Sequence, residues 1–293
     1  MNSVWVDLMG SETKFYQGKK YRTRVIEAGT GEALILIHGV GGHAEAYSRN
    51  IMRLAQDFRV LAIDLLYHGY SSKEPLDGDT IDHYAEQVVE LLDVIGAEKA
   101  YVEGESLGGW IAAWMALHYP ERLHKVILNT TAGIQFDEDK VKVDEKGGIN
   151  LLAERSIAAV NNPNSETIRK RLEWLMASPD RVTDEMVDIR LKIYSNPETQ
   201  KSLTHVFENS FGGGTTPKYY ISEQEAGTIK VPTLVLWSDK NPGTGPDAGE
   251  RLAALIPGAA YYCINNAAHW PQWEQPEEHD RVVSDFCKAA VLA

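Results

Sequence analysis

Short apolar runs of strand length alternate with segments of helical periodicity along most of this chain, and this alternation limits its fold more than any other feature. In the segment 81–95, for example, Val88, Leu92 and Ile95 fall on one face of a helix. Strands that alternate with helical crossovers build a parallel sheet. The sequence therefore predicts an α/β fold, with a mostly parallel central sheet flanked by helices. The runs of strand length are 34–37, 60–63, 100–102, 126–128, 233–237 and 261–264.

The alternation stops between Gly133 and about Gly227. Helical patterns occur there, at 168–176 and 186–194, without a convincing strand. Such a stretch inside an α/β chain is expected to be an inserted helical cap. We therefore expect a core made of residues 1–132 and 228–293, with a cap of residues 133–227 between its two parts.

Composition excludes several classes of partner. The chain has 293 residues and a net charge of −13, and repulsion of that sign opposes nucleic acids and anionic membranes. No apolar run approaches the roughly 18 residues of a membrane span, and no secretory signal is recognised, so we expect a cytoplasmic protein. Cys263 and Cys287 form neither a disulfide framework nor a metal-type spacing. We expect a small-molecule substrate and leave a homodimer open; an acidic substrate would need a local cation.

One strand–turn–helix segment has the pattern of a nucleophile elbow. The run at 100–102 leads into Gly104-Glu105-Ser106-Leu107-Gly108 and then into a helical stretch. The turn is so tight that the residues two positions before and after the serine must lack side chains, which leaves the hydroxyl exposed at the helix N-terminus. Alone, the motif also fits a glycine-rich turn with an incidental serine. Two further loops favour Ser106 as the nucleophile.

The first of these loops has the pattern of an oxyanion hole. The run 34–37 is followed directly by His38-Gly39-Val40. A tetrahedral oxyanion needs two preorganised backbone N–H donors, and the amides of Val40 and Leu107 are the candidates. We expect the His38 ring to brace the loop rather than to move protons.

The second loop carries a candidate general base. His269 follows the last predicted strand, so the nucleophile precedes the base along the chain. A serine hydroxyl becomes a good nucleophile when an imidazole takes its proton. His269 is therefore the predicted base. His43 is expected to line the pocket.

The acid that should orient His269 is uncertain in the sequence. The usual position of this carboxylate, four residues past Trp237, holds Asn241. Its amide can accept a hydrogen bond from an imidazole, but it cannot compensate the charge of an imidazolium. Asp239 is the nearest carboxylate and would serve if the turn were rearranged. Both remain candidates.

These segments together resemble the meta-cleavage product hydrolases, α/β-hydrolases that cut carbon–carbon bonds in ring-opened aromatic compounds. The resemblance spans nearly the whole chain and is closest to the branch for carbazole- or dioxin-type biaryl products. It implies that Arg190, in the cap, binds the 2-oxo-carboxylate end of the substrate and that Trp270 lies beside the catalytic histidine; a surface ion pair is the alternative for Arg190. The segments that carry it are 38–50, 104–110, 128–131, 169–176, 187–194 and 268–274.

Three positions depart from the family pattern. Asn241 replaces the acid, Tyr67 stands where a glycine is usual, and Glu105 precedes Ser106 where many relatives carry asparagine. The first puts efficient turnover in question. Glu105 and Gly39 are expected to shape the substrate pocket.

The expected reaction is hydrolysis of a 2-hydroxy-6-oxo-hexa-2,4-dienoate by Ser106 and His269, without a metal or cofactor. The apolar wall for the substrate is expected from cap residues around Trp174. Two other functions remain open. The same elbow serves carboxylester and lactone hydrolases, and the missing acid is compatible with a weakly catalytic ligand-binding protein.

Overall fold

An eight-stranded sheet forms the centre of the computed structural model, which describes residues 3–74, 80–137, 149–211 and 219–290. The strand order is β1-β2-β4-β3-β5-β6-β9-β10. The pairs β1–β2 and β2–β4 are antiparallel and the others are parallel. The mostly parallel sheet predicted from the sequence is confirmed. The strands are β1 (Glu12–Gln17), β2 (Arg22–Ala28), β3 (Ala33–Ile37), β4 (Arg59–Ile63), β5 (Ala100–Glu105), β6 (Leu123–Asn129), β9 (Thr233–Ser238) and β10 (Ala260–Ile264).

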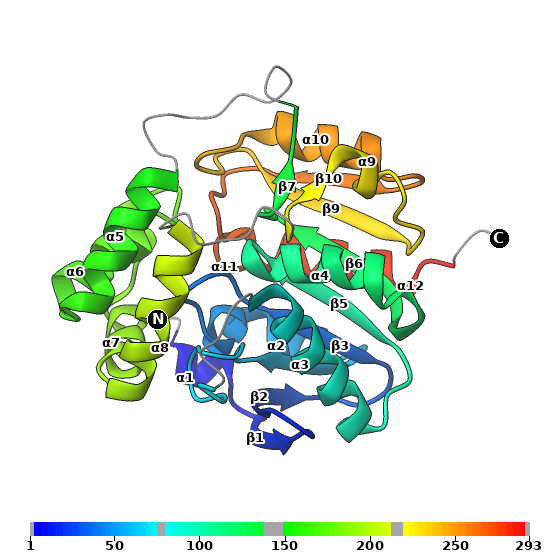
Figure 1. Cartoon of the computed structure of the whole chain (residues 1–293). Helices are drawn as coiled ribbons and strands as arrows, with labels where there is room; N and C mark the ends of the chain where they lie inside the picture. The colour runs from blue at the N-terminus through cyan, green and yellow to red at the C-terminus, as the bar shows by residue number, and fades with distance from the viewer. Residues whose placement is uncertain (1–2, 75–79, 138–148, 212–218, 291–293) are drawn as a thin grey trace.

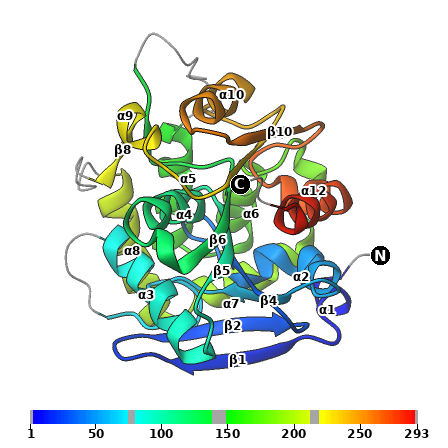
Figure 2. The same cartoon turned by 90° about the vertical axis from the view of Figure 1, so that its right-hand side faces the viewer.

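The antiparallel strands β1 and β2 were not predicted. They form one edge of the sheet, seen at the bottom of Figure 2. Strand β1 is exposed or half-buried throughout, so its sequence carries no apolar run. Strand β3, by contrast, is buried at every position and reads as a continuous apolar run, as expected for a central parallel strand.

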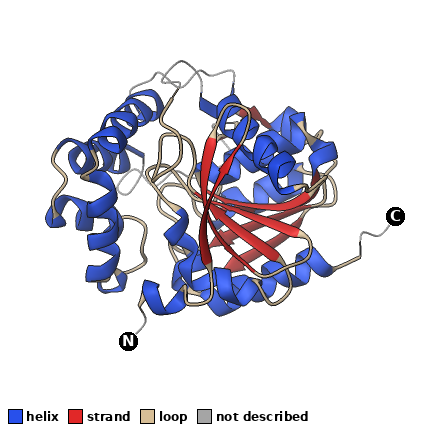
Figure 3. Ribbon diagram, turned by 90° about the horizontal axis from the view of Figure 1, so that it is seen from below, coloured by secondary structure: helices blue, strands red, loops and turns tan. Residues whose placement is uncertain are grey.

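Helices cover both faces of the sheet, as the ribbon diagram in Figure 3 shows. Helices α3 and α4 pack against each other, and α2 packs against α11 and α12. No helix among the described residues is long and apolar enough to cross a membrane. The helices of the core are α1 (Val4–Asp7), α2 (Ser48–Leu54), α3 (Thr80–Ile95), α4 (Leu107–His118), α9 (Glu223–Ala226), α10 (Pro246–Leu255), α11 (Pro271–Glu274) and α12 (Pro276–Lys288), with short 3₁₀ turns at Ala44–Tyr47 and Pro120–Arg122.

Of the described helices between β6 and β9, α5 to α8 form a separate layer, on the left in Figure 1, whereas α9 packs on α10 of the core. The helices of this layer are α5 (Ile149–Asn161), α6 (Ser165–Glu173), α7 (Asp184–Tyr194) and α8 (Pro197–Phe211), with a 3₁₀ turn at Pro179–Arg181. Short strands β7 (Ile134–Gln135) and β8 (Ile221–Ser222) pair where the chain leaves and re-enters the core. The predicted insertion 133–227 also contains residues 138–148 and 212–218, which lie outside the described residues. We infer that α5–α8 are its cap.

A buried cluster of charged side chains links strand β5 to helix α12. His279 Nε2 lies 2.8 Å from Glu103 Oε1, and His279 Nδ1 lies 2.9 Å from Asp280 Oδ1. All three side chains are buried. Burial alone would lower the pKa of His279, but the two carboxylates outweigh it and raise that pKa to about 10. The imidazolium is therefore a structural ion that ties α12 to the sheet.

Replacing His279 should destabilise the fold. Removing one partner of a buried ion cluster costs about 3–5 kcal/mol, and His279→Gln should lower the free energy of unfolding by about that much. Because the pKa is raised in the folded state, this stabilisation is complete below the unfolded pKa of about 6.5 and is lost as pH rises through about 10. Urea unfolding of wild type and His279→Gln at pH 6, 8 and 10 measures the loss of unfolding free energy and its dependence on pH. The half-exposed His124 offers a matched control, and equal effects of His124→Gln and His279→Gln would contradict this role.

Candidate active site

The turn between β5 and α4 places Ser106 in a strained backbone conformation. Ser106 has φ 54° and ψ −113°, in the region that side chains rarely adopt. A Cβ on Gly104 would lie 2.0 Å from the carbonyl of Gly108, and one on Gly108 would lie 2.2 Å from the Ile37 carbonyl oxygen. Both positions therefore accept only glycine. This is the geometry of the predicted nucleophile elbow.

The loop after β3 lies beside Ser106 with free amide donors. Neither Val40 N–H nor Leu107 N–H has a hydrogen-bond partner among the described residues. The Gly39 N–H is engaged and donates to Glu105 Oε2 at 2.8 Å. His38 Nδ1 lies 2.7 Å from the Gly39 oxygen, and its Nε2 accepts the Leu65 N–H at 3.1 Å. The expectation that His38 braces this loop is confirmed.

Asn241 and His269 contact each other directly. Asn241 Oδ1 lies 2.7 Å from His269 Nδ1, and the amide Nδ2 donates to the Thr244 oxygen at 2.8 Å. This second bond fixes the orientation of the amide, so Oδ1 must accept the proton of Nδ1. The neutral imidazole therefore carries its proton on Nδ1 and has a lone pair on Nε2.

Asp239, the other candidate acid, is directed elsewhere. Its carboxylate is exposed and Oδ1 accepts the Ala267 N–H at 3.1 Å, which braces the turn that leads to His269. Of the two candidates, the structure brings Asn241 to the imidazole, as the spacing from Trp237 predicts.

The other nitrogen of His269 faces Glu105. His269 Nε2 lies 3.1 Å from Glu105 Oε1, and the Glu105 side chain is 1% exposed. Burial raises the pKa of Glu105 to about 8, against the lowering effects of the Gly39 amide and of two arginines. Burial, followed by the charge of Arg171, lowers the pKa of His269 to about 3. The Ser106 hydroxyl forms no hydrogen bond within the described part of the chain. The resting site therefore pairs His269 with Glu105 rather than with Ser106.

Two buried arginines from the cap face this pair. Arg190 of α7 is 1% exposed, and none of its three guanidinium nitrogens has a hydrogen-bond partner among the described residues. Arg171 of α6 donates to Ser156 Oγ and the Val40 oxygen, and its Nη1 is without a partner. The alternative of a surface ion pair for Arg190 is therefore wrong. These guanidinium groups are the local cations that an acidic substrate would need in a protein of net charge −13.

Arg171 was not singled out in the sequence analysis. It stands in the run Arg169-Lys170-Arg171, which resembles a solvated basic face. The helical period gives the signal that could have found it: Ile168, Arg171 and Leu172 are spaced i, i+3 and i+4 and are all buried.

The cavity that contains these groups is narrow, about 10 Å³, and cap residues form part of its wall. Trp270 lies on its wall, with its ring centroid 5.3 Å from the Arg190 Cζ. His43 lies elsewhere, in a neighbouring cavity that shares Arg190 and Trp270, and its Nδ1 pairs with Glu45 at 2.9 Å. The expectation that His43 lines the pocket of Ser106 is therefore not supported. The lining residues are Gly39, Val40, Gly42, Glu105, Ser106, Leu152, Arg171, Leu175, Arg190, His269 and Trp270.

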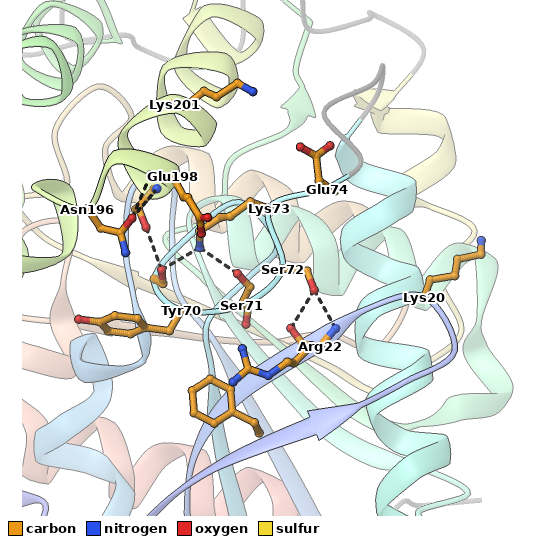
Figure 4. A pocket seen from close by; sticks show the side chains of 13 residues that line it. Lys20, Arg22, Tyr70, Ser71, Ser72, Lys73, Glu74, Asn196, Glu198 and Lys201 are labelled. Atoms are coloured by element: carbon orange, nitrogen blue, oxygen red, sulfur yellow. Dashed lines mark hydrogen bonds between the residues drawn. The ribbon is translucent and has the colours of Figure 1, made fainter.

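A larger hollow, about 710 Å³, lies at the edge of the sheet between β2 and the start of α8 (Figure 4). Its lining is basic, but the Lys73 ammonium already donates to three backbone carbonyls of the same loop. None of the predicted site residues lines this hollow. The grouping of Ser106 with His269 identifies the narrow cavity as the candidate site.

Comparisons with known proteins agree with this geometry. A profile of the α/β hydrolase fold family matches residues 32–276. The chain is 32% identical to a 2-hydroxy-6-oxo-6-phenylhexa-2,4-dienoate hydrolase of Burkholderia cepacia, over 91% of each chain. It is 30% identical to a 2-hydroxy-6-oxononadienedioate/2-hydroxy-6-oxononatrienedioate hydrolase of Burkholderia vietnamiensis, over 92% of each chain. The solved meta-cleavage product hydrolase of Pseudomonas fluorescens IP01 is 27% identical with a TM-score of 0.81, covering 93% of this chain and 96% of that one.

Ser106 and His269 should act as one unit. Ser106→Ala and His269→Ala should each lower kcat for p-nitrophenyl acetate hydrolysis by about 10³-fold or more, because the hydroxyl and the imidazole are both needed for the same attack step. The double variant should then be no worse than either single variant, within about threefold. Steady-state kinetics of the three variants tests this. Additive losses would show that the two residues serve different steps.

Proposed function

The chain belongs to the α/β hydrolase fold family, within the meta-cleavage product hydrolases, and we propose that it hydrolyses a carbon–carbon bond in a 2-hydroxy-6-oxo-hexa-2,4-dienoate. The main support for this proposal is the state of the Arg190 side chain. Its guanidinium is buried in the cavity of Ser106 and has no hydrogen-bond partner among the described residues.

An unpaired buried guanidinium favours an anionic ligand. Burial of an uncompensated charge is costly, and a carboxylate with its neighbouring oxygen can bind both arms of an arginine fork. A neutral ester offers no such group. Arg190 therefore favours a substrate with a carboxylate at one end over an ordinary carboxylic ester.

The reaction then uses the groups around Ser106. Ketonisation of the bound dienoate makes the carbon–carbon bond cleavable, because the leaving carbanion becomes a stabilised dienolate. Ser106 Oγ attacks the 6-oxo carbon while its proton passes to His269 Nε2, and the amides of Val40 and Leu107 hold the oxyanion. Cleavage gives an acyl-serine and a 2-hydroxydienoate, which takes the proton from His269. Water then hydrolyses the acyl-serine to a carboxylic acid.

The 6-substituent of the substrate meets apolar side chains of the cap. Leu152 and Leu175 line the cavity, and the Trp174 ring packs edge-on against His269 at 5.0 Å between centroids. These residues support an apolar substituent. The carbazole- or dioxin-type branch stays a prediction.

Arg190→Gln should separate the two substrate classes. We expect kcat/KM for a 6-phenyl dienoate, followed by loss of its yellow colour, to fall about 100-fold, or about 2.7 kcal/mol. Hydrolysis of p-nitrophenyl acetate, which lacks the carboxylate, should change less than about fivefold.

Arg169→Gln is the matched control, because Arg169 also lies on a cap helix but pairs with Asp184 at the surface. It should leave both activities unchanged. Equal losses of Arg190→Gln on both substrates, or a wild-type protein that prefers the ester by far, would refute the proposed substrate.

A further inference from the structure

We propose that Glu105 supplies, from the Nε2 side of the His269 ring, the negative charge that Asn241 cannot supply from the Nδ1 side. The inference rests on the proposed function, because it takes Ser106 and His269 as the reacting pair. Asn241 and Glu105, two departures from the family pattern, then have a common explanation. The carboxylate that is usual on the Nδ1 side of the imidazole is absent, and a carboxylate lies on the Nε2 side instead.

The proton positions on His269 follow from the orientation of the Asn241 amide. Because the Asn241 amide is fixed by Thr244, the Nδ1 proton of His269 is committed to Asn241 Oδ1. Nε2 then presents a lone pair to Glu105 Oε1 at 3.1 Å. Two lone pairs at this distance repel each other. A proton must therefore lie between the two atoms in the resting site, which makes Glu105 and His269 a proton-sharing pair.

The Glu105 carboxylate is held in position by its strand and by its neighbours. Glu105 is the last residue of β5, so a central strand holds its backbone. Its Oε2 accepts the Gly39 N–H at 2.8 Å, and Trp270 lines the same cavity. The charged and titratable groups that face it from other elements are Arg171, Arg190, Tyr47 and His269. The oxygen that approaches Nε2 is therefore held in place on several sides.

The Glu105 carboxylate also sets the net charge around His269 during the reaction. In the active form Glu105 has released the shared proton and is ionised, His269 is neutral, and the Ser106 hydroxyl proton takes the place of the released proton at the Nε2 lone pair. Attack by Ser106 breaks its Oγ–H bond and forms Nε2–H, so the Glu105–His269 pair changes from −1 to 0 as the oxyanion forms. With Asn241 alone, the same step would create a buried cation whose surroundings include Arg171. Glu105 removes that penalty without a carboxylate at position 241.

Moving the charge back tests the proposal. Glu105→Gln and Glu105→Ala should each lower kcat about 100-fold on both the dienoate and p-nitrophenyl acetate, with little change in KM for the ester. Asn241→Asp alone should change kcat less than about threefold, because the charge is already present. The double variant Glu105→Gln/Asn241→Asp should recover to within about tenfold of the wild type. Circular dichroism confirms that each variant folds.

The pH profile gives a second measure. Because Glu105 must lose its proton before His269 can act, kcat/KM should be low below about pH 8 and rise as pH passes through that value. Glu105→Gln should remove this rise and leave a lower, flatter profile. A merely structural residue would lower the profile without changing its shape.

Retention of kcat within threefold in both Glu105 variants would overturn the inference, as would a double variant as defective as Glu105→Gln. A wild type that hydrolyses the ester and not the dienoate would refute the proposed substrate, while the ester data would still decide the role of Glu105. Should neither substrate turn over, ¹⁵N NMR of the His269 ring, assigned with His269→Gln, decides it. Identical titration of that ring in wild type and Glu105→Gln would exclude the pair.

Discussion

The close contact of backbones between β5, α4 and β3 is the constraint on which the site depends. Gly104 touches the carbonyl of Gly108, and Gly108 touches that of Ile37. No side chain fits between them, so the turn must be sharp and Ser106 must take a positive φ. The same contact brings the loop after β3 against the start of α4. One steric requirement therefore sets the position of the nucleophile and of the amides of Val40 and Leu107.

Charge balance is the second organising principle of the cavity. Two guanidinium groups, Arg171 and Arg190, and one carboxyl group, Glu105, are buried together. With Glu105 ionised the three groups carry a net charge of +1, which one substrate carboxylate neutralises. Without substrate, desolvation favours the protonated form of Glu105. The site is therefore built for a bound anion, although the protein as a whole repels anions.

The sequence predicted the parts of this site that local pattern determines. The six apolar runs coincide with strands, and chain spacing placed Asn241 on the imidazole. It did not predict β1, because an exposed edge leaves no apolar pattern, or β2, because buried polar side chains such as Arg24 and Glu27 interrupt its apolar residues. It also did not predict the contact of Glu105 with His269, because which way a side chain points from a strand end depends on tertiary packing. For Tyr67 the sequence showed a departure from the family pattern but not its physical reason. Tyr67 takes φ 68°, a conformation that explains why glycine is usual at this position.

The cap does more than cover the cavity, because one of its backbone carbonyls and one of its side chains form hydrogen bonds with catalytic segments of the core. The His269 N–H donates to the Leu175 oxygen, and the Arg171 side chain donates to the Val40 oxygen. Helix α6 and the residues just after it therefore hold both the loop that carries His269 and the loop that carries Val40. A cavity of about 10 Å³ cannot admit a dienoate while these contacts and the side chains around them stay in place. Substrate entry must therefore displace side chains that line the cavity, and the cap helices and the residues after α6 contribute four of them: Leu152, Arg171, Leu175 and Arg190. Two of these lining residues, Leu175 and Arg171, also bond to His269 and Val40, so binding of the anionic end of the substrate is linked to the position of the base and of the oxyanion donor.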